Sequence, residues 1–321
     1  MGSGCTSNSN YFGYPTSEIT RGNAIISQMQ KIILYYKFVP VEDAVSVMFW
    51  QKALCEKLEL KGRIIISKHG INGTLGGELK NLRLYKRGMN EHPKFKGMMY
   101  KWSDGTSEHF PKLSVKVRDE IVTFGAGEEL QVDDHGVVGG GTHLKPEQVH
   151  QLVEERGDEV VFMDGRNAYE SEIGQFKGAI KPNVKTAKEF DAELDTPEMQ
   201  KLKDKPIVTY CTGGIRCEIL SSLMKKKGFT DVYQIDGGIV KYGEKYKDEG
   251  LWEGKLYVFD KRMRMGFSDK AVDIGECVHC GNKTSNHINC SELKCNRQVL
   301  VCEKCLGQTT ICNRHTAVVQ N

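Results

Sequence analysis

The chain has 321 residues, of which 39% are hydrophobic and 27% are charged, and its formal net charge is +3. This length allows two domains, or two domains and an appendage, each able to bury a hydrophobic core. The composition is ordinary for a soluble protein. No run approaches the roughly 18 apolar residues of a membrane span, and so small a charge does not by itself indicate a nucleic-acid partner.

Residues 1–30 are polar and have no apolar core, so they predict a disordered leader rather than a secretory signal. Gly2 followed by Thr6 fits the short N-myristoylation pattern, with Cys5 as a second lipid site, but the pattern is common and an unmodified leader is favoured. Seven of the eleven cysteines lie between residues 277 and 312. Because no secretion signal accompanies these cysteines, we expect them to bind metal or to act in catalysis in the reducing cytoplasm. No membrane is expected as a partner.

Residues 31–125 have the pattern of a ferredoxin-like α+β sandwich of the acylphosphatase or RRM type. Apolar runs predict strands, helical spacing predicts helices, and Asn72-Gly73 is typical of a tight turn. The predicted order is strand 32–39, helix 41–60, strand 62–67, a strand from 74, helix 79–90 and strand 113–117. This β-α-β-β-α-β order indicates the ferredoxin-like fold.

Residues 126–145 are acidic and then glycine-rich, which predicts a linker. Across 146–250 helices and strands alternate, as in an α/β domain with a parallel sheet covered on both faces. The predicted helices are 146–153, 187–194 and 215–226, and the predicted strands are 160–163, 207–210 and 232–235. Residues 251–321 form a cysteine-rich C-terminal region.

The chemistry is clearest in the six-residue loop between strand 207–210 and helix 215–226. Its residues are Cys211, Thr212, Gly213, Gly214, Ile215 and Arg216. The two glycines let backbone N–H groups converge on the cysteine, and the positive end of the helix dipole and Arg216 add to their effect. These features predict a nucleophilic thiolate at Cys211 with a lowered pKa.

This loop resembles that of the rhodanese superfamily. Met163-Asp164-Gly165-Arg166 resembles the first signature of that family, and Asp236-Gly237-Gly238-Ile239 resembles its last. The loop has the length of sulfur-handling rhodaneses, one residue shorter than in the related phosphatases. An active module is favoured over an inactive one in which Cys211 is only a packed residue.

Two neighbours of the loop have less certain roles. Cys217 follows Arg216 and is either a resolving thiol for Cys211 or a packed helix residue. We include it among the candidate catalytic residues with Cys211 and Arg216. Glu218 is interpreted as a charge at the start of the helix.

A basic stretch interleaved with aromatic residues predicts an RNA-binding face. Its candidate residues are Lys80, Arg83, Lys86, Arg87, Lys94 and Lys96. A solvated helix face above an ordinary core is slightly favoured over RNA binding by these residues alone. In the segment 66–75, Lys68, His69 and Asn72 suit either a polar ligand site or an ordinary hairpin.

The order of these parts resembles the TrhO/YceA family of rhodanese-domain tRNA hydroxylases over about residues 31–312. The motifs that carry this resemblance are His-Gly-Ile-Asn-Gly-Thr-Leu at 69–75, the loop around Cys211 and the cysteine-rich tail. The resemblance implies oxygen-dependent 5-hydroxylation of the wobble uridine of tRNA, position 34, with Cys211 as the active cysteine and oxygen as co-substrate. The sequence contains no flavin or nicotinamide motif and no clear two-histidine-one-carboxylate set.

Two other functions are consistent with the same residues. One is a sulfurtransferase that passes a persulfide from Cys211 between a sulfur donor and a thiol or an RNA. The other is a non-catalytic adaptor that binds RNA or protein through the first domain and the tail.

The tail contains a dense series of metal-ligand residues and predicts a zinc-ribbon-like region. The candidates are Cys277, Cys280, Cys290, Cys295, Cys302, Cys305, Cys312 and His315. Paired at C-x2-C and C-x2-H spacing, they suffice for two four-ligand zinc sites, or for one site with spare residues. Similar proteins tend to have cysteine where this chain has His315. Structural zinc is favoured over free thiols, disulfides or an iron–sulfur cluster.

Overall fold

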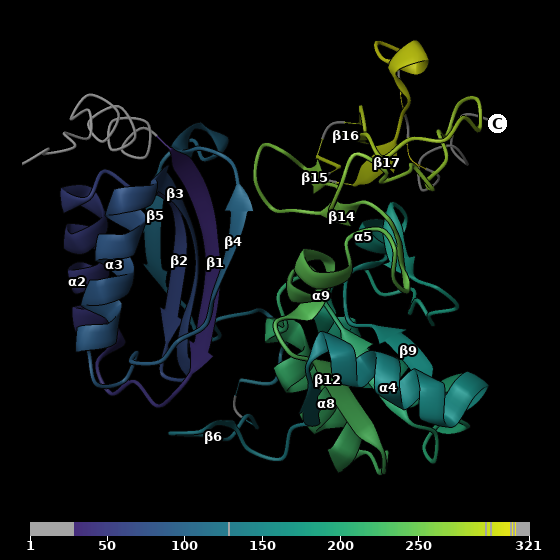
Figure 1. The fold of residues 1–321 in the computed structure, drawn as a ribbon, viewed down its shortest axis with the longest axis horizontal. Coiled ribbons are helices and arrows are strands. Elements are labelled where there is room, and N and C mark those ends of the chain that lie inside the picture. The colour runs from purple at the N-terminus through teal and green to yellow at the C-terminus, as the bar shows by residue number, and fades with distance from the viewer. Residues whose placement is uncertain are drawn as a thin grey trace, which may run out of the picture.

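The computed structural model describes residues 29–127, 129–292, 294–295, 297–308, 310 and 312. The predicted leader, apart from its last two residues, and His315 lie outside this part of the chain. Figure 1 shows an N-terminal domain, a central domain and a C-terminal region that lies above the central domain. Within the described residues, no helix combines the length and apolar character needed to cross a bilayer.

The N-terminal domain is a five-stranded sheet with two helices on one face (Figure 1). The strand order is β4-β1-β3-β2-β5, and all neighbouring pairs are antiparallel except β2 and β5. The elements are β1 (Gln30–Phe38), α2 (Ala44–Lys57), β2 (Lys61–Ser67), β3 (Gly70–Glu78), α3 (Leu79–Glu91), β4 (Tyr100–Asp104), the short η1 (Ser107–His109) and β5 (Leu113–Val117). The first four strands in this order are those of a ferredoxin-like sandwich, so that prediction is confirmed.

Two details of the predicted domain are wrong. Asn72-Gly73 lies inside β3, opposite Tyr36 and Tyr35 of β1, and the turn is formed by Lys68 and His69. Gly73 has a packing role, because a Cβ there would lie 2.3 Å from the ring of Tyr35. The strand that closes the ferredoxin-like core is β4, which the sequence analysis missed, whereas the strand at 113–117 is β5, added in parallel at the edge beside β2.

The alternation of side chains along β1 gives the sheet two different apolar faces. Ile33 and Tyr35 belong to the core under α2 and α3. Ile32, Leu34 and Tyr36 point to the opposite face, as the two-residue period of a strand requires. That second face is covered by the central domain and the C-terminal region rather than by water.

The central domain has a parallel sheet in the order β8-β12-β11-β9, covered on both faces. Its strands are β8 (Thr142–Leu144), β9 (Val161–Asp164), β10 (Gly174–Phe176), β11 (Ile207–Tyr210) and β12 (Val232–Ile235), of which β10 pairs outside the sheet. Its helices are α4 (Pro146–Arg156), η2 (Gly157–Glu159), α5 (Ala168–Ser171), η3 (Ala187–Glu189), α6 (Phe190–Glu193), α7 (Pro197–Gln200), α8 (Ile215–Lys226) and α9 (Gly238–Tyr246). Successive residues of β11 alternate between the two cores: Ile207 packs with α8, and Val208 packs with α9.

The segment 126–145, for which composition predicts a linker, is structured. It contains the short hairpin of β6 (Val132–Asp133) and β7 (Gly136–Val137), and it ends in the edge strand β8. Ala126 and Leu130 are buried in the same core as Phe190 of α6. This acidic and glycine-rich segment therefore contributes apolar residues to the core, which composition alone does not reveal.

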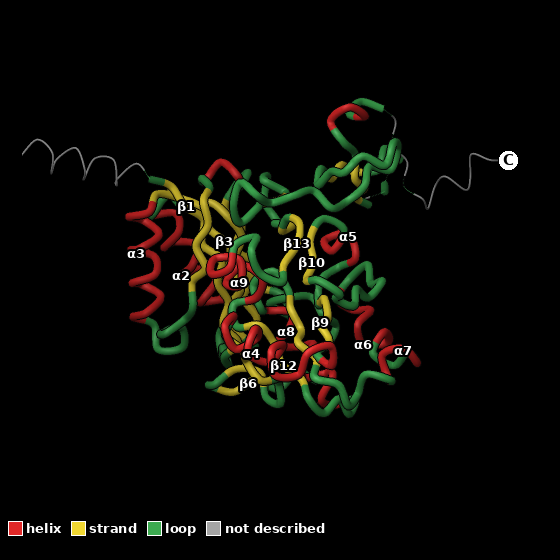
Figure 2. The backbone as a smooth tube through the Cα atoms, turned by 45° about the vertical axis from the view of Figure 1, so that its right-hand side comes forward, coloured by secondary structure: helices red, strands yellow, loops and turns green. Residues whose placement is uncertain are grey.

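The C-terminal region consists of short strand pairs. Its elements are β13 (Trp252–Gly254), β14 (Leu256–Tyr257), β15 (Arg264–Met265), β16 (His287–Asn289), β17 (Gln298–Leu300) and η4 (Glu303–Cys305). β13 pairs with β10 of the central domain, and Leu300 packs against Ile173 and Tyr257. Figure 2 shows this region above the central domain, with α2 and α3 on the far side of the N-terminal sheet.

Candidate active site

The predicted cysteine loop connects the end of β11 to the start of α8. Cys211 follows Tyr210 directly and is 1% exposed. Gly214 has a φ of +99°, a conformation that glycine adopts without strain, and its N–H donates to Cys211 Sγ at 3.2 Å. The loop thus places a buried sulfur at the amino end of a helix, as the sequence predicts.

The surroundings of Cys211 favour the thiolate. Burial by itself raises the pKa of this thiol, but the Cys217 thiol, the positive charge of Arg216 and the N–H groups of both residues outweigh it. Together they lower the pKa to about 5, so the sulfur is anionic at neutral pH. Cys55, buried in the N-terminal core without such partners, shows the opposite effect, because burial raises its pKa to about 12.

Arg216 is held by a carboxylate that the sequence analysis did not assign. Its guanidinium forms two hydrogen bonds with Glu170 of α5, at 2.6 and 2.9 Å, and one with Thr212 Oγ1 at 3.2 Å. Glu170 is fully buried and also accepts from the N–H of Asn167. Arg216 therefore fixes the shape of the loop while its charge stabilises the sulfur.

Cys217 lies in the first turn of α8, 1% exposed, and its thiol hydrogen-bonds Cys211. Burial, and then the negative charge expected on Cys211, raise the pKa of Cys217. Cys217 is thus packed in the helix beside the reactive sulfur, and the resolving role considered for it stays a prediction.

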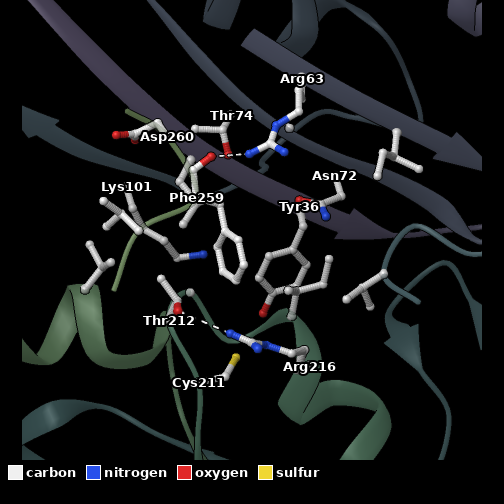
Figure 3. Close-up of a pocket in the computed structure, with 18 of the residues that line it drawn as sticks. Tyr36, Arg63, Asn72, Thr74, Lys101, Cys211, Thr212, Arg216, Phe259 and Asp260 are labelled. Atoms are coloured by element: carbon white, nitrogen blue, oxygen red, sulfur yellow. Dashed lines mark hydrogen bonds between the residues drawn. The ribbon is translucent and has the colours of Figure 1, made fainter. Parts of the chain in front are cut away.

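Cys211 opens into a cavity of about 680 Å³ between the three parts of the protein (Figure 3). The second face of the N-terminal sheet forms its roof, with Tyr36 and Lys101 among the lining residues. The cysteine loop forms its floor, and the turn after β14 contributes Phe259. Figure 3 shows the rings of Tyr36 and Phe259 and the ammonium of Lys101 directed toward the loop.

The cavity combines aromatic rings with cationic and neutral polar side chains. The cationic residues that line it are Arg63, Lys101, Lys188, Arg216 and Arg262. The carboxylate recorded in the lining, Asp260, is paired with Arg262. Flat rings and hydrogen-bond donors suit a planar ligand that carries carbonyl oxygens or phosphate. The sequence does not directly indicate that the N-terminal domain lines the cavity. The apolar residues on both sides of β1 are the signal that its second face is covered.

The two loop glycines also make room for the N-terminal domain. A Cβ on Gly213 would lie 2.8 Å from Leu34 Cδ2, and a Cβ on Gly214 would lie 2.8 Å from the hydroxyl of Tyr36. Tyr36 in turn donates a 2.9 Å hydrogen bond to Glu218 of α8. Glu218 therefore anchors the interface between the domains, beyond the helix-start charge that the sequence indicates.

The basic residues proposed for RNA binding do not line this cavity. Four of them belong to α3, which covers the outer face of the N-terminal sheet (Figure 2). Lys94 pairs with Asp134 at 3.2 Å, and Lys80 pairs with Glu78 at 3.0 Å. Any contact of the four α3 residues with RNA would be made on the outer side of the N-terminal sheet, across the sheet from the cavity.

The cysteines of the C-terminal region form two clusters. Cys277, Cys280, Cys302 and Cys305 have their sulfurs within 4.8 Å of one another, as do Cys290, Cys295 and Cys312. Cys280 Sγ and Cys302 Sγ are 3.6 Å apart, and Cys295 Sγ and Cys312 Sγ are 3.8 Å apart. Tetrahedral zinc with Zn–S bonds of about 2.3 Å separates its sulfurs by about 3.8 Å, so both clusters fit such an ion.

Comparison with known proteins accounts for all three parts of the chain. A model described as a UPF0176 acylphosphatase-like domain matches residues 30–121, a rhodanese-like domain matches 145–245 and a rhodanase C-terminal model matches 253–316. A Corynebacterium jeikeium protein named tRNA uridine(34) hydroxylase is 61% identical over 286 residues, which are 88% of this chain and 93% of that protein.

Relatives with the same name occur in other organisms. One from Corynebacterium urealyticum is 60% identical and covers 88% of this chain and 95% of its own length. One from Arthrobacter sp. (strain FB24) is also 60% identical, with coverages of 86% and 94%. Identity of this degree over nearly the whole chain confirms the resemblance noted from the motifs, and the chain belongs to the tRNA uridine(34) hydroxylase family.

Proposed function

We propose that this protein hydroxylates the wobble uridine of tRNA, position 34, at carbon 5, with Cys211 as an essential residue. The observation that carries the proposal is the identity of about 60% to proteins named for this activity, over nearly the whole chain. The site supports it, because an anionic sulfur lies at the floor of a cavity lined with aromatic rings and donors. Arg216 keeps the loop in shape, and Cys217 stabilises the sulfur.

The proposal is tested by mass spectrometry of tRNA nucleosides from a strain that lacks this gene and any other enzyme for the same modification. Wild-type protein is expected to restore 5-hydroxyuridine derivatives, and Cys211→Ser is expected to restore none. Cys55→Ala is the matched control, because it removes a buried thiol of raised pKa far from the loop. Normal hydroxylation with Cys211→Ser would exclude the proposed role of the cysteine.

A second candidate function is sulfur transfer, favoured by the acidic thiol of Cys211 and the second thiol beside it. In this reaction the thiolate of Cys211 would attack thiosulfate, form a persulfide and release sulfite. Thiocyanate production from thiosulfate and cyanide measures it directly. Strong thiocyanate production together with unchanged tRNA uridines would favour this function over hydroxylation.

The cofactors that we propose are structural zinc and, as co-substrate, molecular oxygen. Zinc would be held by Cys277, Cys280, Cys302 and Cys305, and a second ion by Cys290, Cys295 and Cys312 with His315 as the fourth ligand. Four protein ligands leave no position for substrate, so the metal would stabilise the C-terminal region only. Growth without oxygen should abolish the modification in the complemented strain. A tRNA-modifying enzyme of this kind is expected to act in the cytoplasm.

A further inference from the structure

Lys101 is a buried cation that the N-terminal domain places against the cysteine loop. It lies in β4, opposite Leu34 of β1, and is 2% exposed. Its side chain lies beside two glycines of the central domain: a Cβ on Gly213 would lie 3.9 Å from its Cδ, and a Cβ on Gly237 would lie 3.4 Å from its Cε. Lys101 and Cys211 line the same cavity, and their charges interact.

The ammonium of Lys101 has no hydrogen-bond acceptor among the described residues. Its closest recorded partner is the ring of Tyr36, whose centroid is 4.5 Å from Nζ. Burial lowers the pKa of Lys101 to about 8, despite the nearby negative charges of Cys211, Asp236 and Glu218. The side chain is buried while its ammonium faces the cavity, so the folded protein leaves this donor available to a ligand.

The arginines of the cavity are already bound to the protein. Arg216 is held by Glu170, and Arg262 is held by Asp260 and Ser103. Arg63 donates to the carbonyl oxygen of Phe259. Lys188 of η3 also lines the cavity, but it is exposed, so water can solvate its ammonium. Among the cations recorded in the cavity lining, Lys101 is therefore the buried one whose ammonium remains available to a ligand.

We propose that Lys101 is a substrate-positioning residue whose ammonium donates a hydrogen bond to O4 of the uracil ring in the cavity beside Cys211. This inference rests on the proposed function, since it takes uridine as the substrate. Carbon 5 is bonded to the carbon that carries O4, whereas O2 lies on the far side of the ring. A ring with carbon 5 toward the cysteine loop thus brings O4, rather than O2, toward Lys101. Cytosine carries an amino group there, which an ammonium cannot use as an acceptor.

The test compares Lys101→Met, which replaces the aliphatic stem but removes the ammonium, with Lys101→Arg and with Lys116→Met. Lys116 is an exposed lysine of β5 in the same sheet, away from the cavity. Lys101→Met should restore at most about one tenth of the wild-type 5-hydroxyuridine, the effect expected for one charged hydrogen bond. Lys101→Arg should recover part of the activity, and Lys116→Met should behave as wild type.

Two further measurements distinguish positioning from a structural role. Lys101→Met should unfold at the same or a higher temperature than wild type, because it removes an unsatisfied buried charge. An anticodon stem-loop RNA with uridine 34 should protect Cys211 from iodoacetamide better than the same RNA with cytidine 34, and Lys101→Met should abolish this difference.

The outcomes separate this inference from the function on which it rests. Absence of 5-hydroxyuridine with wild-type protein would reject the function. Full hydroxylation by Lys101→Met, in a strain where wild type is active, would overturn the role of Lys101 alone. A clear fall in the unfolding temperature of Lys101→Met would overturn it as well, because it would show that the ammonium stabilises the fold.

Discussion

The hydroxyl of Tyr36 donates a 2.9 Å hydrogen bond to the carboxylate of Glu218, joining the N-terminal sheet to the helix that follows the cysteine loop. Burial, together with the negative charge of Glu218, raises the pKa of Tyr36, so the phenol stays neutral and remains a donor. Glu218 also accepts from Gln234 at 2.9 Å and pairs with His143 at 3.3 Å. The roof of the cavity is thereby fixed to its floor beside Cys211.

Tyr36→Phe should weaken the contact between the two domains. The substitution leaves the partly buried Glu218 with one donor fewer, which is expected to lower the free energy of unfolding by about 1–2 kcal/mol. Urea denaturation followed by fluorescence measures this change. Tyr246→Phe is the matched control, since no acceptor for its hydroxyl is recorded among the described residues and it lies in α9 away from the interface. Equal stability of the two variants would show that the Tyr36 bond contributes nothing.

The sequence predicts those features of the site that are determined locally. The strand before Cys211, the glycines after it and the helix that begins at Ile215 are adjacent in the chain, and their geometry follows from their residue types. Glu170 is 46 residues from Arg216, so only the tertiary fold reveals it as the partner. The local sequence pattern thus predicts the reactive thiol of Cys211, but it does not predict the carboxylate that holds Arg216 in place.

The roof of the cavity could not be predicted for a similar reason. Tyr36 and Lys101 belong to a domain whose sequence indicates a fold but not the surface against which it packs. Asn72-Gly73 predicts a turn because Asn-Gly is a frequent turn dipeptide, whereas in the structure Gly73 leaves space for Tyr35. The same residue type serves both purposes, and only long-range packing distinguishes them.

Cys217→Ala should raise the pKa of Cys211, because it removes the thiol that hydrogen-bonds the anionic sulfur. The loss of one hydrogen bond to a charged group corresponds to about one pKa unit. Below its pKa the thiolate fraction falls about tenfold per pH unit, so alkylation should slow between pH 4 and 6 and stay unchanged above pH 7. Cys217→Ser, which keeps a donor, should give a smaller shift.

The measurement is the rate of iodoacetamide labelling of Cys211 as a function of pH. Trypsin cleaves after Arg216 in the denatured product, so Cys211 and Cys217 fall in separate peptides and mass spectrometry counts each one. Cys55→Ala serves as the control and should leave the profile unchanged. Identical profiles for wild type and Cys217→Ala would contradict the role assigned to the Cys217 thiol.

Removal of metal should destabilise the C-terminal region. The purified protein is expected to contain zinc, and Cys280→Ser should contain about one ion less than wild type, because four sulfurs are needed to close the first cluster. Chelation should lower the unfolding temperature of wild type more than that of Cys280→Ser. Elemental analysis gives the stoichiometry. A wild-type protein free of metal, with unchanged stability in chelator, would exclude zinc from both clusters.

Gly214→Ala should destabilise the protein more than Gly178→Ala, although both positions have a positive φ, +99° and +70°. The strain of a left-handed alanine is common to both and amounts to about 1 kcal/mol. A Cβ on Gly178 meets no atom within 4 Å, whereas on Gly214 it would lie 2.8 Å from the Tyr36 hydroxyl.

A double-mutant cycle identifies the source of the additional cost at Gly214. If the hydroxyl of Tyr36 causes it, Tyr36→Phe should reduce the cost of Gly214→Ala, so that the two changes are less than additive in urea denaturation. The cost of Gly178→Ala should be the same in both backgrounds, because that position is remote from the interface. Additive effects of Tyr36→Phe and Gly214→Ala would mean that the loop glycine is required only for its backbone conformation. Less than additive effects would mean that it is also required for the N-terminal domain to close over Cys211.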